Sequence, residues 1–303
     1  MRLLDFFFAA RPLLHLPIWT IYLISLHYHH RFSGENLGWT DPIIMAGISL
    51  LFAGAAYLNQ VYDFESDRIN RKVGFLQRGF LDRTRLSAGF VVASFVALAT
   101  APLISRFLLF VFAQLLVLSY AYSAPPLRLK DRPVGGLFAN AWGHGLLVSV
   151  AVMPDMTIHN AGLLDWHIPI YFFFAVAATY VLTTIPDRVG DAVVGKRTTA
   201  VVLGRSGALA AALVLLVLAA FTAFTSQHAL LFYLAVGAGF AVVAALFLGG
   251  DATARFAAKA PLMVLTLAAG YLYPLYLVFV VALLIATRAY YHKRFGVVYP
   301  ELA

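Results

Sequence analysis

The residues best suited to chemistry in this sequence are two pairs of aspartates, each pair spaced four residues apart. Asp63 and Asp67 follow Asn59 at the same spacing, and Asp187 and Asp191 form the second pair. If the preceding helices continue through them, each pair stacks on one helix face, where two carboxylates repel each other unless a cation lies between them. The spacing therefore predicts metal binding.

The residue types around these pairs favour a hard divalent cation with phosphate as a further ligand. Neither pair contains a histidine and the chain has no cysteine, so zinc and iron sites are less favoured. Carboxylates facing each other across a polar opening suit Mg²⁺, which keeps several waters and shares its coordination shell with phosphate oxygens. Basic residues follow both pairs, namely Arg68, Lys72, Lys196 and Arg197. Together these features predict a phosphorylated lipid as substrate.

A third stretch, from Tyr120 to Lys130, ends an apolar run with two consecutive prolines. The prolines fix an extended loop, from which Arg128 and Lys130 would reach a phosphate on the side of the metal sites. Two interpretations of Tyr122 remain open. It is either an aromatic residue of the membrane interface or a ring face that stabilises a cation inside a cavity.

Asn140 and His144 are polar residues four apart in the next apolar run, so they share one helix face. Polar groups within a membrane span usually face the interior of the helix bundle. We expect these two side chains either to contact an acceptor substrate or to serve as polar packing groups.

The composition is that of a membrane-embedded chain. Of the 303 residues, 62% are hydrophobic and 12% are charged, whereas soluble domains carry about 25% charged residues. Crossing the hydrocarbon core takes roughly 20 apolar residues, and the sequence contains about nine runs of that order. We expect an all-α, polytopic membrane protein with one domain over residues 1–303 and no removable signal peptide. The expected spans are Pro12–His30, Asp41–Tyr62, Leu86–Ser105, Phe107–Ser123, Gly135–Met153, His167–Ile185, Ser206–Thr225, Ala229–Leu248 and Pro261–Tyr291.

The basic residues predict the orientation of the chain in the bilayer. Most of the 22 Lys and Arg residues fall on the side that carries both aspartate pairs, so this side is expected to face the cytoplasm. The net charge of +8 then reflects topology and attraction to anionic headgroups or phosphate, and no nucleic acid partner is expected. The last span is too long for a straight crossing, and Gly270 and Pro274 could kink or divide it. Division would bring the C-terminus to the cytoplasmic side as well.

The three polar stretches together resemble the UbiA superfamily of intramembrane prenyltransferases, over about Asn59 to Gly204. The likeness rests on order, spacing and membrane side. It is carried by Asn59-x-x-x-Asp63-x-x-x-Asp67, by Asp187-Arg-Val-Gly-Asp191 with the Gly195-Lys196-Arg197 that follows, and by the loop from Tyr122 to Lys130. Two departures concern the substrate side: Thr183 stands where many members have Asn, and the Arg-Pro that commonly follows the first motif is absent.

This resemblance implies an all-helical enzyme whose central cavity opens sideways to lipid beneath cytoplasmic cap loops. Mg²⁺ held by the four aspartates would bind the diphosphate of a prenyl donor. Ionisation would leave an allylic carbocation, shielded by Tyr122, for a lipophilic or aromatic acceptor to attack. The expected substrate contacts are Asn59, Arg68, Lys72, Arg128, Lys130, Asn140, His144, Thr183, Lys196 and Arg197.

Two alternatives use the acidic pairs differently. A cation-coupled secondary transporter would bind ions there, but transporters place such sites near the bilayer midplane, whereas these pairs end helices beside basic loops. A phosphotransferase acting on a nucleotide-activated lipid would need one compact cluster of acids with Gly and Arg, which the sequence does not show. The acceptor stays open between a quinone-ring precursor, geranylgeranylglyceryl phosphate and a tetrapyrrole.

Overall fold

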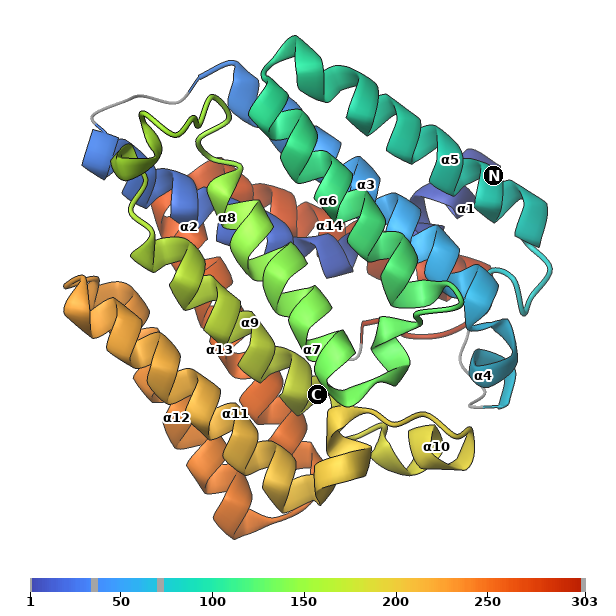
Figure 1. Cartoon of the computed structure of the whole chain (residues 1–303). Helices are drawn as coiled ribbons and strands as arrows, with labels where there is room; N and C mark the ends of the chain where they lie inside the picture. The colour runs from blue at the N-terminus through green and yellow to red at the C-terminus, as the bar shows by residue number, and fades with distance from the viewer. Residues whose placement is uncertain (1, 34–37, 70–73, 301–303) are drawn as a thin grey trace.

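The computed structural model describes residues 2–33, 38–69 and 74–300, and every regular element in these ranges is a helix (Figure 1). Helices are expected at membrane depth because they satisfy their backbone hydrogen bonds internally. The longer helices are α1 (Arg2–Ala9), α2 (Leu16–Ser33), α3 (Thr40–Tyr62), α5 (Arg83–Thr100), α6 (Arg106–Ser123), α7 (Pro133–Asn140), α9 (His167–Thr184), α11 (Thr199–Thr225), α12 (Ala229–Leu248), α13 (Asp251–Leu272) and α14 (Pro274–Phe295). The shorter ones are η1 (Pro12–His15), α4 (Phe64–Ile69), η2 (Ala101–Leu103), η3 (Leu129–Asp131), η4 (Ala141–Leu147), α8 (Val148–Val150), η5 (Ala161–Leu163) and α10 (Arg188–Val193).

Within the described ranges, seven helices are long and apolar enough to cross a membrane. The count becomes eight if the bent pair formed by residues 3–9 and 12–31 is one span. The all-helical, multi-pass prediction is therefore confirmed, whereas the expected count of nine is not.

The last expected span, Pro261–Tyr291, is in fact parts of two helices. α13 ends at Leu272 and α14 begins at Pro274, which has no backbone N–H to continue the ladder of α13. The two helices pack closely beside this break, since a Cβ added to Gly270 would lie 2.9 Å from Cβ of Leu277. Of the two outcomes left open for this segment, a kink or a division, the structure shows a division into two helices.

Because of this division, α14 ends beside α1 and the end of α3. Arg294 donates to Asp5 of α1 through Nε and Nη2 at 3.0 and 2.9 Å. Gln60 near the end of α3 donates to the carbonyl of Ala9 at 2.7 Å. The basic C-terminal end thus lies on the same side as the first aspartate motif and adds to the positive charge there.

The expected span Gly135–Met153 is a continuous run of α7, η4 and α8, and η4 is a π-helical segment. π-helical turns within α-helices are rare and frequent at functional sites. This one packs tightly on α9, because a Cβ on Gly145 would lie 2.5 Å from the carbonyl oxygen of Phe172. His144 lies within it, so the irregular turn sets the direction of that side chain.

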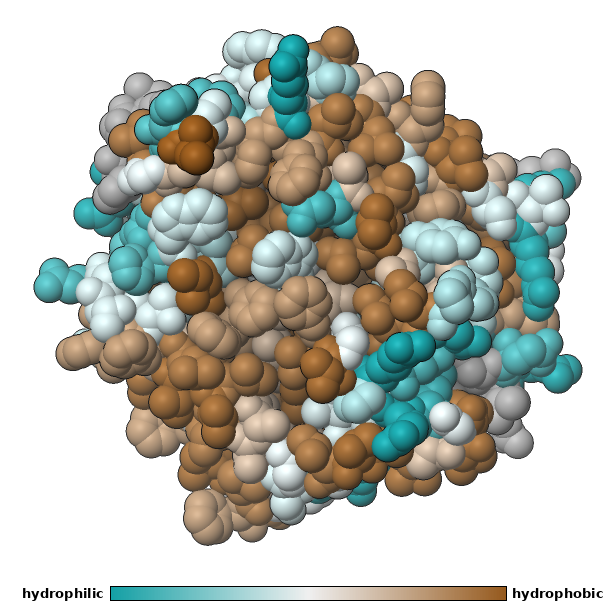
Figure 2. Space-filling view, in the orientation of Figure 1, coloured by the Kyte–Doolittle hydropathy of each residue, from teal (hydrophilic) through white to brown (hydrophobic). Residues whose placement is uncertain are grey.

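Polar loops and short helices gather at one end of the bundle. α4, α10 and the connection from α6 to α7 lie together at the lower right of Figure 1. In the same orientation, hydrophilic side chains gather there while the face over the long helices is mostly apolar (Figure 2). The fold therefore separates a surface suited to lipid from one polar end that holds both aspartate motifs.

Candidate active site

The first aspartate motif begins in the last turn of α3 and crosses a junction into α4. Asp63 is the residue between the two helices. Its N–H donates to the carbonyl of Asn59, and the N–H of Asp67 donates to the carbonyl of Asp63, both at 2.8 Å. These bonds keep the four-residue register across the junction, so the helical spacing expected for the three residues is present.

Lys130 is the basic residue that meets this motif. Its Nζ lies 2.7 Å from Oδ1 of Asp63 and donates to Oδ1 of Asn59 at 2.8 Å. Asp63, Asp67 and Lys130 are each only 7% exposed, so the carboxylate and the ammonium group face each other away from bulk water. Burial lowers the pKa of Lys130 from its ordinary value, and the carboxylate of Asp63 opposes this effect.

The loop after α6 delivers Lys130 through a short turn. Arg128 has a left-handed backbone with φ of 40° and precedes η3, so the chain reverses there. The guanidinium of Arg128 turns to Asp131, with Nε 2.8 Å from Oδ2. The loop therefore presents Lys130 to the motif, while Arg128 forms a partly exposed local pair.

The second aspartate motif lies on α10, after α9 has ended. Asp187 precedes the first residue of α10, and Asp191 donates its N–H to the carbonyl of Asp187 at 2.8 Å. Nζ of Lys196 lies 3.8 Å from Oδ1 of Asp191, and the hydroxyl of Thr198 donates to Oδ2 at 3.4 Å. Asp187 is exposed and Asp191 is partly buried, so this motif is more open than the first.

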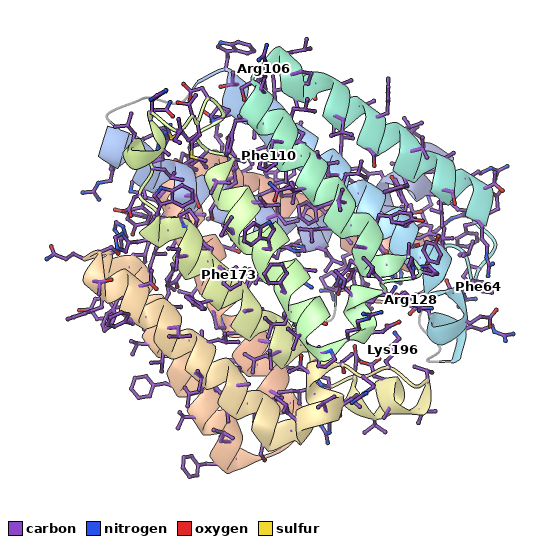
Figure 3. All side chains as sticks on the ribbon, in the orientation of Figure 1. Phe64, Arg106, Phe110, Arg128, Phe173 and Lys196 are labelled. Atoms are coloured by element: carbon purple, nitrogen blue, oxygen red, sulfur yellow. The ribbon has the colours of Figure 1, made fainter. Side chains whose placement is uncertain are left out.

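The two motifs lie near each other at one end of the bundle (Figure 1). Lys130 lies within electrostatic range of both Asp63 and Lys196, so the two acid–lysine pairs are close enough to interact. The backbone N–H of Arg197 donates to the carbonyl of Asp131 at 3.0 Å, tying the second motif to the loop that carries Lys130. Figure 3 shows Arg128 and Lys196 at the same end of the molecule and Arg106 at the opposite end.

Among the residues that the structure describes, no three carboxylates or imidazoles lie close enough to hold one metal ion. Lysines stand beside the acids instead, at 2.7 Å in the first motif and 3.8 Å in the second. The donors gathered here are carboxylate, amide and hydroxyl oxygens, a set suited to Mg²⁺ that shares phosphate oxygens with neighbouring lysines.

A cavity of about 310 Å³ opens from the first motif into the bundle. Its polar lining residues are Arg11, His15, Asn59, Ser119, Tyr122, Asn140 and His144. Its remaining lining is largely apolar and includes Phe52 and Leu118. The ring of His144 lies 4.5 Å from that of Phe52, between centroids, so His144 lies on the apolar side of the cavity.

Tyr122 is held at the polar end of this cavity. It lies against Asn140 and Tyr180, and within electrostatic range of Asp63. Tyr180 can approach only because Gly136 has no side chain, since a Cβ there would lie 1.9 Å from the Tyr180 hydroxyl oxygen. Tyr122 thus lies on the cavity wall.

Several expected substrate contacts point elsewhere. Arg68 pairs with Glu65 at 3.0 Å, and both side chains are more than 60% exposed. Thr183 is exposed and donates to the carbonyl of Tyr180, and the side chain of Arg197 is also exposed. Lys72 lies outside the described residues.

Arg11 is a site residue that the sequence analysis did not identify. It lies between α1 and η1 with φ of 54°, in the left-handed region that non-glycine residues rarely adopt. Its side chain lines the cavity together with Asn59. The available signal was a single arginine in the otherwise apolar residues 6–14, followed by a proline that cannot continue the helix.

Fold and site together define a multi-pass helical membrane protein with acid–lysine pairs at one end of the bundle and a largely apolar cavity beside Asn59. The profile of the UbiA prenyltransferase family matches residues 16–259. The chain therefore belongs to the UbiA prenyltransferase family. This membership favours prenyl transfer over the transporter and phosphotransferase alternatives.

Two curated relatives match about half of the chain. The digeranylgeranylglyceryl phosphate synthase of Thermococcus gammatolerans is 31% identical over 166 residues, covering 54% of this chain and 56% of that protein. A probable chloroplastic homogentisate phytyltransferase 2 of Oryza sativa subsp. japonica is 27% identical over 156 residues, covering 48% of this chain and 41% of that protein. The chain thus spans 41–56% of the length of these relatives.

Solved structures share the fold at low identity. A UbiA homologue from Archaeoglobus fulgidus bound to GPP and Mg²⁺ has a TM-score of 0.69 and 19% identity, covering 88% of this chain and 98% of that one. The same homologue bound to DMAPP and Mg²⁺ gives 0.67 and 18%, with the same coverage. A homologue from Aeropyrum pernix K1 gives 0.63 and 18%, covering 84% and 97%.

Proposed function

We propose that this prenyltransferase moves a polyprenyl group from a prenyl diphosphate to a lipophilic or aromatic acceptor in a Mg²⁺-dependent reaction. The observation that carries the proposal is the pairing of Asp63 with Lys130 next to Asn59, which lines a largely apolar cavity, together with the second acid–lysine pair of Asp191 and Lys196. Anion-binding and cation-binding groups stand next to each other there, as a metal–diphosphate complex requires.

Asp63, Asp67, Asp187 and Asp191 would hold Mg²⁺, which stabilises the negative charge that builds on a departing diphosphate. The oxygen-only donor set supports this assignment, as do the Archaeoglobus fulgidus structures bound to prenyl diphosphates with Mg²⁺.

The lysines would bind the diphosphate directly. Lys130 is held by Asp63 and Asn59, and its ammonium group would donate to a phosphate oxygen as it does to these oxygens. Lys196 would do the same from the second motif. Asn59 orients Lys130, and Thr198 orients Asp191 through its hydroxyl.

The cavity would hold the prenyl chain and exclude water from the cation. Tyr122 at the polar end presents a ring that stabilises positive charge on the allylic carbons. Exclusion of water keeps the cation from being captured as an alcohol. Asn140 and His144, farther along the same wall, would then contact the acceptor.

Arg11 supports an acceptor that carries an anionic group. It is a cation on the wall of the cavity that Asn59 also lines, held in a strained backbone conformation of the kind that concentrates at functional sites. The names of the two curated relatives refer to a glyceryl phosphate and to homogentisate, and both compounds are anionic.

The test is product analysis with purified protein, labelled geranylgeranyl diphosphate and a panel of anionic and neutral acceptors. We expect a prenylated anionic product by mass spectrometry, and loss of product when EDTA removes divalent ions. Arg11→Gln should raise the KM of an anionic acceptor without changing the KM of the donor. Turnover that persists in EDTA would contradict the metal assignment, and a neutral preferred acceptor would contradict the role of Arg11.

We also propose that the motif side faces the cytoplasm, supported by the excess of basic residues there. The chain has no cysteine, so single cysteines report sidedness without background. Val134 at the start of α7 is 74% exposed, and Ile158 beyond the other end of that run is 90% exposed. In intact cells an impermeant thiol reagent should label Ile158→Cys and spare Val134→Cys, and the reverse pattern would overturn the orientation.

A further inference from the structure

The first aspartate motif is approached by a helix from the N-terminus. Gln60, next to Asn59, donates to the carbonyl of Ala9, and the hydroxyl of Tyr57 donates to the carbonyl of Phe6 at 3.0 Å. α1 therefore lies along the end of α3 that carries the motif.

α1 is joined in turn to α14 by a buried ion pair. Asp5 is 1% exposed, and its two carboxylate oxygens accept from Nε and Nη2 of Arg294 at 3.0 and 2.9 Å. Tyr290 donates its hydroxyl to the same carboxylate, and its ring stacks on Phe8 with centroids 3.9 Å apart. A two-point arginine–carboxylate pair fixes orientation as well as distance.

The same guanidinium reaches the segment that follows the motif. Cζ of Arg294 lies 3.6 Å from the ring centroid of Phe80. Phe80 belongs to a turn over residues 74–82 that is closed by its N–H donating to the carbonyl of Phe75 at 2.9 Å. Phe75 is buried and lies 5.0 Å from Phe295, between ring centroids. One arginine thus contacts α1, which supports the start of the motif, and the turn that follows its end.

This arrangement is carried largely by the ends of the chain. The family profile matches residues 16–259, so Asp5, Tyr290 and Arg294 all lie outside the matched segment. The two terminal helices nevertheless meet next to the motif rather than at the opposite end of the bundle.

We propose that Arg294 is a positioning residue for prenyl transfer. By holding α1 and the 74–82 turn together, it sets where Asp63 and Asp67 stand relative to the second motif, and so controls donor binding. The inference rests on the proposed role of these aspartates at the donor diphosphate. Arg294 itself lies on α14 and acts through Asp5 and Phe80.

The experiment compares Arg294→Gln with Arg288→Gln, which removes the same charge from an exposed position on the same helix. For Arg294→Gln we expect the donor KM and the Mg²⁺ concentration for half-maximal rate to rise roughly tenfold, because both would depend on holding the aspartates of the two motifs at a fixed separation, and a binding site tolerates displacements of only about 0.5 Å. The KM of the acceptor should change much less. Arg288→Gln should match wild type, and Arg294→Lys should recover part of the loss.

Phe80→Leu keeps the Asp5–Arg294 pair and removes only the ring beneath the guanidinium. It therefore tests the positioning role even if Arg294→Gln does not fold. We expect it to raise the donor KM in the same direction by a smaller factor. An unchanged donor KM in both variants, even with a lowered unfolding temperature, would overturn the positioning role. Wild-type activity that does not depend on Mg²⁺ would instead overturn the proposed metal site. The donor KM of the Arg294 and Phe80 variants would still test the positioning role.

Discussion

The two aspartate motifs share one spacing but differ in their surroundings. Asp63 and Asp67 are 7% exposed, and Lys130 lies 2.7 Å from Asp63. Asp187 is exposed, and Lys196 lies 3.8 Å from Asp191. The first motif continues a long helix packed in the bundle, whereas the second lies on the six-residue helix α10 outside it.

This difference indicates a division of labour at the opening. Buried, paired groups hold their geometry before substrate arrives, which lowers the cost of binding. The second motif is less buried and its pair is longer, so its geometry is less fixed before substrate arrives. We infer that the first motif is the preorganised half of the donor site.

The largest effect is expected from the preorganised half. Asp63→Asn should lower kcat/KM by roughly 100-fold to 1000-fold, because it removes a carboxylate that would hold Mg²⁺ at the diphosphate. Labelled donor and product mass spectrometry measure it. Asp155→Asn, an exposed acid on the loop beyond α8, is the matched control and should behave as wild type. Equal activity of the two variants would remove Asp63 from the site.

Lys130→Met should come next. The change removes a charged donor that would bind the diphosphate, and a hydrogen bond to a charged group contributes about 1.5–3 kcal/mol, so the KM of the donor should rise by roughly tenfold or more. Lys130→Arg keeps the charge and should retain part of the affinity. Titration with a non-hydrolysable donor analogue measures the change, and a Lys130→Met protein that binds the analogue as wild type does would contradict it.

Lys196→Met should have a smaller effect than Lys130→Met, about threefold to tenfold on the donor KM, since its pair is longer and more exposed. The same assay measures both lysines. An effect of Lys196→Met larger than that of Lys130→Met would reverse the division of labour between the motifs.

Thr183→Asn should have the smallest effect. This change restores the residue common in similar sequences, but Thr183 is exposed and its hydroxyl donates to the carbonyl of Tyr180. The donor KM should stay within about twofold of wild type, as for other exposed substitutions. A tenfold gain in affinity would show that the side chain reaches the donor in the bound state.

Local patterns in the sequence predicted much of the fold. Apolar length and charge placed the helices, and the register of Asn59, Asp63 and Asp67 follows directly from their spacing. The division at Pro274 was left open beforehand, since a proline can kink a helix as well as end it.

The expected phosphate contacts were less well predicted because basic side chains form ion pairs with acidic residues close to them in sequence. Arg68 pairs with Glu65 and Arg128 with Asp131, each within one helical turn. Such pairs at three-residue spacing are visible in the sequence and argue against long reach. Lys130 has no acidic residue three positions away, and its contact with Asn59 spans 71 residues of sequence.

The amino-acid sequence by itself determined which groups this protein can use: two acidic pairs, their basic neighbours and an apolar chain long enough to fold within a bilayer. These are properties of residue type and short spacing, which helix geometry converts into faces and ends. Only the tertiary structure decided which groups meet. Lys130 rather than Arg128 enters the first motif, Arg11 lines the cavity, and the two chain ends join beside Asn59. Such contacts depend on packing between distant segments, where the burial of a charge is offset only by a partner that the fold itself supplies.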